Sequence, residues 1–403
     1  MNKATMESAP IIIVGGGIGG CAAALMLARH GVRVRLLEQA TELGEIGAGI
    51  QLGPNAFRMF DELGITDAVL DTVVYPEHLT MMDGLDGRLV TRMRLGKPFQ
   101  ERFGKPYGVI YRADLHAVLV NACRGQPGIE LLTGQKMISY RDIEDAIVVD
   151  TEDGQRHEGT ALIGCDGLWS KVRSQLLGDG KPRVSGHIAY RAVLPTAEVP
   201  EALRLNDMTL WAGPKNHLVQ YPLRRGELTN LVAVFHSDRY VEGWDAMADV
   251  NELHQRFSDA CPQVKTLLSK IEAWRMWVLC DRDPVREWSR GRVTLLGDAA
   301  HPMLQYMAQG AAMAMEDAVC IASHIGSAPS VEQAFLRYQA ERYLRTGRVQ
   351  LTARMYGEVF HAKGVAAEVR NQILGARSDV QGYESLAWLY DQPADPLLVT
   401  AST

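Results

Sequence analysis

The chain has 403 residues, of which 47% are apolar and 22% are charged, and its formal net charge at pH 7 is -6. A chain of this length can bury a large core and is long enough for two domains. The negative charge and the lack of a basic run argue against nucleic acid as a partner, because that binding needs a basic face to displace counterions from phosphates.

Nothing in the sequence predicts export or insertion into a membrane. The first ten residues lack the apolar core of a secretory signal, and no run approaches the roughly 18 apolar residues that span a bilayer. The six cysteines have no metal-ligand spacing, so we expect them to be reduced and mostly buried. We therefore expect a cytoplasmic protein that is not an integral membrane protein.

The first elements form a strand, helix and strand over residues 11–14, 21–30 and 32–37. Gly15, Gly17 and Gly20 lie between the first strand and the helix. The first glycine permits a tight turn, the second lets the backbone approach a pyrophosphate, and the third lets the helix pack on the strand. Glu38 ends the second strand, where it is placed to accept hydrogen bonds from an adenosine ribose. This pattern predicts a dinucleotide site; a glycine turn without a ligand is the alternative.

The next segments contain two further polar positions. A helix is expected over residues 114–123, and Arg112 precedes it. Strands over residues 146–151 and 160–164 flank a turn at Asp153-Gly154, and Asp166 follows the second of these strands. Taken alone, Asp166-Gly167 is only a turn signal and Arg112 is only a surface arginine.

The sequence pattern changes near residue 182, where β-branched and aromatic residues begin to alternate with polar ones. Strands over residues 208–212, 217–223 and 228–235 suggest an antiparallel sheet, with a hairpin connection at residues 224–227 and a helix at 250–257. Alternation places His217 and Tyr221 on one face. A histidine that titrates near neutrality suits a base, although both side chains could merely satisfy partners within the sheet.

A last strand over residues 292–296 leads into Asp298, and a helix of small residues begins at Gly310 and Ala311. Asp298 could bind the hydroxyls of a ribityl chain, or it could be an ordinary cap or turn residue. The N-terminus of the helix could stabilise negative charge on a reduced flavin. His301 is expected to shape the loop together with Pro302. A long helical segment begins near Val331.

These motifs occur together and in a characteristic order. With the segments 44–54, 216–223, 281–284 and 305–310, they resemble the single-component flavin-dependent aromatic hydroxylases over nearly the whole chain. The resemblance implies an α/β protein with a Rossmann-like FAD-binding domain, an inserted antiparallel-sheet substrate domain and a C-terminal helical region. The expected ranges are 1–76, 100–182 and 276–345 for the FAD-binding domain, 77–99 and 183–275 for the sheet domain, and 346–403 for the helical region.

The resemblance also implies a reaction. FAD would be held tightly but not covalently, and NADH would reduce it as a visiting co-substrate. Dioxygen would then form a flavin C4a-hydroperoxide that hydroxylates a small aromatic acid. Within the family the likeness is strongest to the members that convert 3-hydroxybenzoate to gentisate by attack para to its hydroxyl. Salicylate and 6-hydroxynicotinate are alternative substrates. A flavin-binding NADH oxidase or redox module, and a nicotinamide dehydrogenase without flavin, are alternatives of another class.

Roles for particular residues follow from the resemblance alone. His217 would be the base, while Tyr221 and Gln305 would orient the substrate. Arg112 would lie near the flavin, and Asp166 would serve the approach of FAD and the nicotinamide. The aromatic residues of the C-terminal tail would suit either a homodimer contact or packing within the chain.

Overall fold

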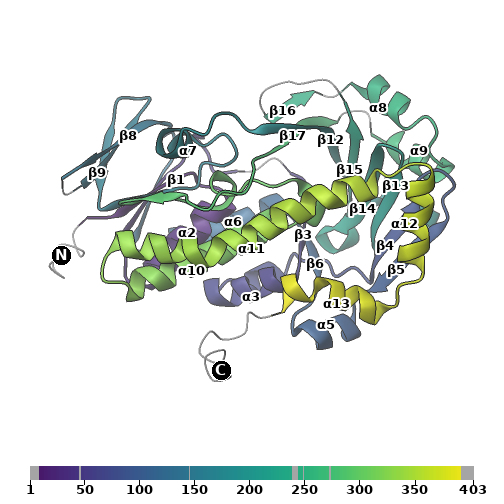
Figure 1. Ribbon diagram of the computed structural model, residues 1–403, viewed down its shortest axis with the longest axis horizontal. Helices are drawn as coiled ribbons and strands as arrows, with labels where there is room; N and C mark the ends of the chain where they lie inside the picture. Colours follow the sequence, from purple (N-terminus) through teal and green to yellow (C-terminus); the bar gives the residue numbers. More distant parts are fainter. Residues whose placement is uncertain are drawn as a thin grey trace.

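A computed structural model describes residues 9–44, 47–144, 146–237, 244–247, 249–271 and 274–391 (Figure 1). Two lobes lie side by side, one around β1 and one around β12 to β15, and the long helix α11 (Val331–Phe360) runs across both. No helix in the described ranges is long and apolar enough to cross a membrane. All six cysteines are unpaired and five are buried, as expected.

The first lobe is built on a six-stranded sheet in the order β18-β19-β11-β1-β2-β7. All neighbours pair in parallel except β18 and β19. The strands are β1 (Ile11–Val14), β2 (Val34–Leu37), β7 (Ile129–Leu132), β11 (Ala161–Gly164), β18 (Ser289–Arg290) and β19 (Val293–Leu295). Every residue of β1, β11 and β19 is buried, which is typical of a parallel sheet covered on both faces.

Helices and two small sheets complete this lobe. Its helices are α2 (Ile18–Arg29), α3 (Pro54–Leu63), α4 (Thr66–Leu70), α6 (Arg112–Arg124), α7 (Lys171–Leu177) and α10 (Gly310–Ser327). One small sheet joins β8 (Met137–Ile143), β9 (Ala146–Thr151) and β10 (Arg156–Gly159), and the other joins β3 (Gly49–Leu52) and β6 (Gly108–Tyr111). The turn at Asp153-Gly154 therefore leads into β10. The two predicted strands and the turn are confirmed, but β10 was not predicted; it pairs with β9, whereas β11 pairs with β1 in the large sheet.

The second lobe is an eight-stranded, mostly antiparallel sheet in the order β16-β17-β12-β15-β14-β13-β4-β5. The strands are β4 (His78–Asp83), β5 (Leu89–Arg94), β12 (Arg183–Pro195), β13 (Met208–Gly213), β14 (Asn216–Leu223), β15 (Leu228–His236), β16 (Trp244–Met247) and β17 (Arg275–Asp281). The predicted hairpin between β14 and β15 is confirmed, with the short turn η3 (Arg224–Gly226) between them. The turns η1 (Thr196–Glu198) and η2 (Glu201–Leu203) follow β12.

The two faces of this sheet have different neighbours. Leu218, Leu231 and Phe235 point toward α8 (Val250–Arg256) and α9 (Pro262–Leu268), where they form an apolar core with Leu253 and Leu267. The opposite face packs on the first lobe and on α11, with Val232 and Val234 against Tyr306 of the turn η5 (Gln305–Met307). Strand alternation therefore assigns every second residue of β12, β14 and β15 to the junction between the lobes.

Two of the expected domain boundaries fall inside single elements, the helix α11 and the strand β17. α11 is one continuous helix of 30 residues, so a boundary at 345/346 would divide it. β17 pairs with β12, so the sheet domain extends past residue 275. Of the remaining helices, α5 (Lys97–Phe103) and α13 (Asp379–Tyr390) lie at the lower edge in Figure 1, and α12 (Val365–Gly375) lies at the right-hand edge. Tyr390 packs against Phe99 and Phe103, so this part of the tail serves packing within the chain.

Candidate functional site

The residues expected to hold a cofactor gather at one edge of the six-stranded sheet. Gly15 follows β1, Glu38 follows β2, Asp166 lies two residues past β11, and Asp298 lies within the turn η4 (Gly297–Ala299) after β19. Because these four strands are parallel, their carboxyl ends share one edge. The N-termini of α2 and α10 also reach this edge, so several backbone N–H groups face the same place.

The glycine loop has the geometry that its spacing predicts. Gly15 has a φ of 105°, a left-handed conformation that favours glycine, and a Cβ there would overlap the carbonyl oxygen of Cys165. A Cβ on Gly20 would overlap the carbonyl oxygen of Gly15. Gly17 is the N-cap of α2 and carries no side chain over the helix end. The turn and the close packing of helix on strand are therefore confirmed.

Glu38 lies directly against this loop. Its Oε2 accepts a hydrogen bond of 2.7 Å from the Gly16 N–H, and its Oε1 accepts one of 2.8 Å from the Ala40 N–H. The carboxylate is thus fixed at the entrance of the loop, half-buried, by backbone donors on both sides. Binding of a ribose by Glu38 remains a prediction.

Asp166 has a local structural role. Its carboxylate accepts hydrogen bonds from the Ser170 hydroxyl at 2.6 Å and from the N–H groups of Lys171 and Val172 at 2.7 and 3.1 Å. These contacts hold the first turn of α7. Arg173, which is buried in that helix, donates to the carbonyl oxygens of Ala299 and Ala300. The loop after β11 is thereby tied to the loop after β19, and direct contact of Asp166 with a cofactor stays a prediction.

Asp298 and Arg112 come together from distant parts of the chain. Burial raises the pKa of the Asp298 carboxyl, and the positive charge of Arg112 opposes that rise. Burial likewise lowers the pKa of Arg112, which Asp298 opposes. Yet Asp298 keeps an exposed surface and Arg112 is half-exposed. Both residues are therefore accessible at this edge of the sheet, where a ligand can meet them.

The N-terminus of α10 lies next to Asp298. Gly310 and Ala311 are half-exposed there, and a Cβ on Gly310 would lie 3.7 Å from an Asp298 oxygen. Beside this helix end Asn55 donates to Gln309 at 2.9 Å, while its own Oδ1 is buried without a partner among the described residues. An unfilled acceptor, a free helix end and a glycine loop fit a polar ligand with an extended phosphate, as FAD has.

His301 supports the loop from behind, as expected. Its Nε2 lies 2.5 Å from Oδ2 of Asp317, which also accepts from the Gly297 N–H at 3.1 Å. Arg342 of α11 donates to the other oxygen of Asp317 at 2.7 Å. All three side chains are buried, so this group fixes the loop that presents Asp298.

The predicted substrate residues lie on the sheet face that meets the first lobe. His217 and Tyr221 are both buried on that face of β14, and Gln305 is half-buried in η5 opposite them. A Cβ on Gly49 would overlap the ring of Tyr221, so this glycine lets β3 approach the ring closely. The structure therefore brings together residues separated by more than 170 positions, since the Gly49 N–H donates at 2.8 Å to Asn230, a cross-strand partner of Tyr221.

Arg191 belongs to this face and was missed from the sequence. Its guanidinium donates a hydrogen bond to Oε1 of Gln305 and lies 5.4 Å from the centre of the Trp277 ring. Burial lowers its pKa; the nearby Tyr221 opposes that change and Arg112 adds to it. Its Nε is buried without a partner among the described residues. Arg191 is thus close enough to Arg112 for the two charges to interact, and nothing near it in the sequence marked it.

His217 has an unexpected set of neighbours. Its Nδ1 shares a hydrogen bond of 2.7 Å with Nε2 of His361, and His187 and His236 lie beside His361. These histidines are far apart in the sequence, so no local pattern marks the group. Burial, with a smaller contribution from His187, lowers the pKa of His217 to about 3, so its resting form is neutral.

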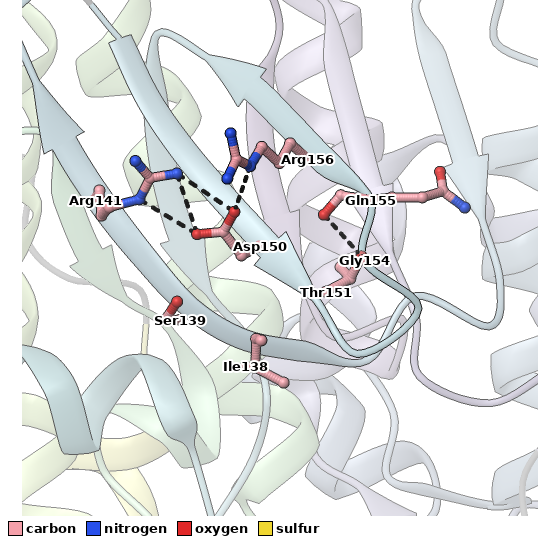
Figure 2. A pocket seen from close by; sticks show the side chains of 8 residues that line it. All are labelled: Ile138, Ser139, Arg141, Asp150, Thr151, Gly154, Gln155 and Arg156. Carbon is pink, nitrogen blue, oxygen red and sulfur yellow. Dashed lines mark hydrogen bonds and ion pairs between the residues drawn. The ribbon is translucent and has the colours of Figure 1, made fainter.

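Two hollows lie on the surface of the described residues. One, of about 340 Å³, lies on the sheet of β8 to β10, where Arg141 and Arg156 both pair with Asp150 (Figure 2). None of the predicted site residues lines it. The other, of about 460 Å³, reaches Tyr221 from the side of Arg204 and Arg225.

Comparison with known proteins gives consistent results. The family model described as "FAD binding domain" matches residues 8–352. The chain is 45% identical over 383 residues to 3-hydroxybenzoate 6-hydroxylase of Polaromonas naphthalenivorans (strain CJ2), covering 94% of this chain and 95% of that protein. It is 45% identical over 389 residues to the Klebsiella oxytoca enzyme of the same name, covering 96% and 98%. The crystal structure of Klebsiella pneumoniae HpxO with FAD and uric acid has a TM-score of 0.85 at 23% identity, covering 98% and 100%.

Proposed function

Because this chain belongs to the FAD-dependent aromatic monooxygenases, we propose that it hydroxylates 3-hydroxybenzoate para to its hydroxyl to give gentisate, with NADH as the electron donor. The family expected from the motifs is confirmed, and with it the α/β fold and the FAD cofactor. The names of the two relatives, each covered almost completely, support the substrate.

The cofactor-binding residues follow from the edge of the parallel sheet. We assign the pyrophosphate to Gly15, Gly17 and Gly20, the adenosine ribose to Glu38, and the ribityl chain to Asp298. Bound FAD, once reduced, supplies the activated oxygen. The N–H groups at Gly310 and Ala311 would hold negative charge at the pyrimidine end, because the positive end of α10 points there. Asp166 acts through the loop it caps.

Each proposed substrate residue binds a different group of the aromatic acid. Arg191 is the cation placed to pair with the carboxylate, since guanidinium groups bind carboxylates in a planar, two-point geometry. Gln305 and Tyr221 would orient the ring, and Arg112 closes the side nearest the cofactor. His217 accepts the phenolic proton, because an electrophilic oxygen reacts faster with a phenolate than with a phenol. The observation that carries this proposal is the hydrogen bond between Arg191 and Gln305, with Tyr221 close to Arg191. Arg112 is close enough to interact electrostatically with both Arg191 and Asp298, which links this group to the cofactor end.

NADH is assigned as a visiting reductant. The chain has one dinucleotide fingerprint, after β1, which FAD would occupy. The reductant would therefore bind without a domain of its own.

A homodimer is the second part of the proposal. The tail aromatics Phe360 and Tyr390 pack within the chain. Leu336, Leu344, Leu351 and Met355 instead recur along one face of α11, between 45% and 69% exposed. A second exposed stripe, Val365, Val369 and Ile373, follows on α12. Apolar stripes of this kind on neighbouring helices are typical of self-association. Light scattering of wild type and Leu351→Glu tests the pairing.

Substrate-stimulated NADH oxidation tests the reaction. Purified, FAD-loaded protein is mixed with 3-hydroxybenzoate, salicylate or 6-hydroxynicotinate, and the product is identified by mass spectrometry. We expect gentisate in step with NADH consumption from the first acid. Product from one of the other acids alone would reassign the substrate. If none of the three acids changes the rate of NADH oxidation, the protein would be an oxidase or a redox module.

A further inference from the structure

Three histidine rings form a hydrogen-bonded line that begins at His217. Nδ1 of His217 lies 2.7 Å from Nε2 of His361, and Nδ1 of His361 lies 3.0 Å from Nε2 of His236. The three residues come from β14, the C-cap of α11 and the end of β15. The crossing of α11 over the sheet, visible in Figure 1, makes this line, since His361 is 144 residues from His217 in sequence.

The line runs from the buried substrate face to a more accessible position. His217 and His361 are buried, with 2% and 5% of their surface exposed, while His236 is half-exposed. Nε2 of His217 has no hydrogen-bond partner within the described part of the chain, so it is available to a substrate hydroxyl. Glu358, Lys215 and Arg256 are the charged groups around His236. His187 stands beside the line, and its Nδ1 bonds the Tyr306 hydroxyl at 2.6 Å.

The surroundings disfavour a charged ring anywhere on the buried part. Burial, together with the neighbouring rings, lowers the pKa of His361 and of His217. A proton taken from a phenol would therefore have no stable resting place on His217. A neutral imidazole has another option, because it can accept a proton at one nitrogen while it releases the proton on the other.

We propose that His361 and His236 are positioning residues that carry the phenolic proton from His217 to solvent, an inference that rests on the proposed function. The substrate O–H bond breaks as His217 Nε2 gains the proton. His217 Nδ1–H passes its proton to His361 Nε2, His361 Nδ1–H passes its proton to His236 Nε2, and His236 Nδ1–H releases one to water. One proton leaves the substrate and one enters solvent, and no ring ends charged.

The same line resets the enzyme. When the hydroxylated ring regains its aromaticity, the oxygen that lost a proton recovers one, and the transfers run in reverse. Each ring then returns to its starting tautomer. Neither the outward nor the return transfer needs an oxidant, a reductant or a metal.

A metal ion is the rival explanation. His187, His236 and His361 place one nitrogen each within 4.8 Å of one another. Both nitrogens of His361, however, already take part in hydrogen bonds, at 2.7 Å and 3.0 Å. To bind a metal, one of these nitrogens would have to give up its hydrogen bond so that its lone pair is available. The line of contacts therefore favours proton transfer.

The test uses FAD-loaded His361→Gln and, as the matched control, His187→Gln. Glutamine can keep hydrogen bonds at either position but cannot exchange one proton for another. We expect hydroxylation by His361→Gln to fall about 10²-fold at pH 7, the lower end of what proton transfer contributes to catalysis. His187→Gln should stay within about threefold of wild type. A second variant, His361→Phe, tests whether packing alone explains any loss.

Two readouts separate transfer from support of the structure. With the line broken, only substrate that is already ionised reacts, so the hydroxylation rate of His361→Gln should rise about tenfold per pH unit from pH 7 to 9. Added imidazole should also restore part of the rate, most clearly in His361→Phe. Wild type should stay nearly level over this range, because burial keeps His217 and His187 neutral throughout.

The outcomes have distinct meanings. A wild type that hydroxylates no aromatic acid would overturn the proposed function. A productive wild type with His361→Gln matching it in rate and pH profile would overturn the proton line alone. A loss in His361→Gln that neither pH nor imidazole relieves would also overturn it, as would a stoichiometric metal that His361→Gln and His187→Gln both lose.

Discussion

The cofactor end and the substrate end of the site are built from different parts of the polypeptide. At the cofactor end, backbone does most of the work: Gly15, Gly20 and the N-termini of α2 and α10 meet at the carboxyl ends of parallel strands. At the proposed substrate end, side chains on a sheet face are arranged instead: His217, Tyr221 and Arg191. His217 shares a hydrogen bond with His361, and Arg191 donates one to Gln305. Substitutions should therefore have different effects at the two ends. At the cofactor end they should reduce the amount of bound FAD, and at the substrate end they should reduce product formation.

The largest effect is expected at the backbone end, from Gly20→Val. A side chain there would overlap the Gly15 carbonyl, which cannot move without opening the turn between β1 and α2. We expect purified protein with almost no FAD, measured by absorbance near the flavin band. Gly96→Ala is the control, because a Cβ at Gly96 meets nothing within 4 Å. Flavin content equal to wild type in Gly20→Val would remove the glycine loop from the binding site.

His217→Ala should produce the next largest effect, confined to the substrate end. FAD should remain bound and NADH oxidation should stay substantial, while gentisate formation falls roughly 10²-fold and hydrogen peroxide rises in its place, since proton transfer typically contributes 10²- to 10⁴-fold. Product and peroxide are measured per NADH consumed. His254→Ala, an exposed histidine on α8, is the control. Unchanged coupling in His217→Ala would exclude His217 from the reaction.

Asp298→Ala should have a smaller effect and should act at the cofactor end. Loss of a hydrogen bond that a hydroxyl donates to a carboxylate costs about 1.5 kcal/mol or more, so FAD should bind roughly tenfold more weakly. Titration of apoprotein with FAD measures it. Asp298→Asn keeps an acceptor oxygen and should lose less. If Asp298→Ala retained FAD with wild-type affinity, the assignment of this residue to the ribityl chain would be wrong.

The same contrast explains which parts of the molecule were predictable. Backbone requirements leave a record in sequence, because only glycine fits at Gly15 and Gly20, and so the cofactor edge could be found from spacing. Arg191 left none. Its setting depends on Gln305 and Trp277, which are 114 and 86 positions away, and nothing near it in sequence marks it. His361 was missed for the same reason, since its meaning arises only where α11 crosses the sheet.

Two of the predicted domain boundaries fall inside single elements for a related reason. The alternation of β-branched and aromatic residues with polar ones distinguished the sheet from the nucleotide-binding segments. The helix α11, however, packs on both lobes and has no break in its helical pattern. β17 likewise continues the sheet beyond the change in sequence pattern. Local sequence shows which element forms, whereas pairing across the fold decides to which lobe the element belongs.

The smallest effect concerns the acid stability of the cofactor end. Burial alone would raise the pKa of Asp317, but His301 and Arg342 lower it to about 2. In the unfolded chain this carboxyl titrates near its ordinary value of 3.8. A folded pKa below the unfolded one means that the charged carboxylate stabilises the fold above about pH 4, and that this stability is lost as the pH falls from there toward 2.

Asp317→Asn tests this sign directly. The free energy of unfolding, measured with urea between pH 6 and pH 2.5, should fall less steeply for the variant in the acid range, because one fewer proton is taken up on unfolding. At pH 6 the variant should be less stable, since it leaves Arg342 with one fewer buried partner. Asp259→Asn, at an exposed position, should follow wild type throughout. Parallel curves for Asp317→Asn and wild type would mean that the loop presenting Asp298 does not depend on this buried charge.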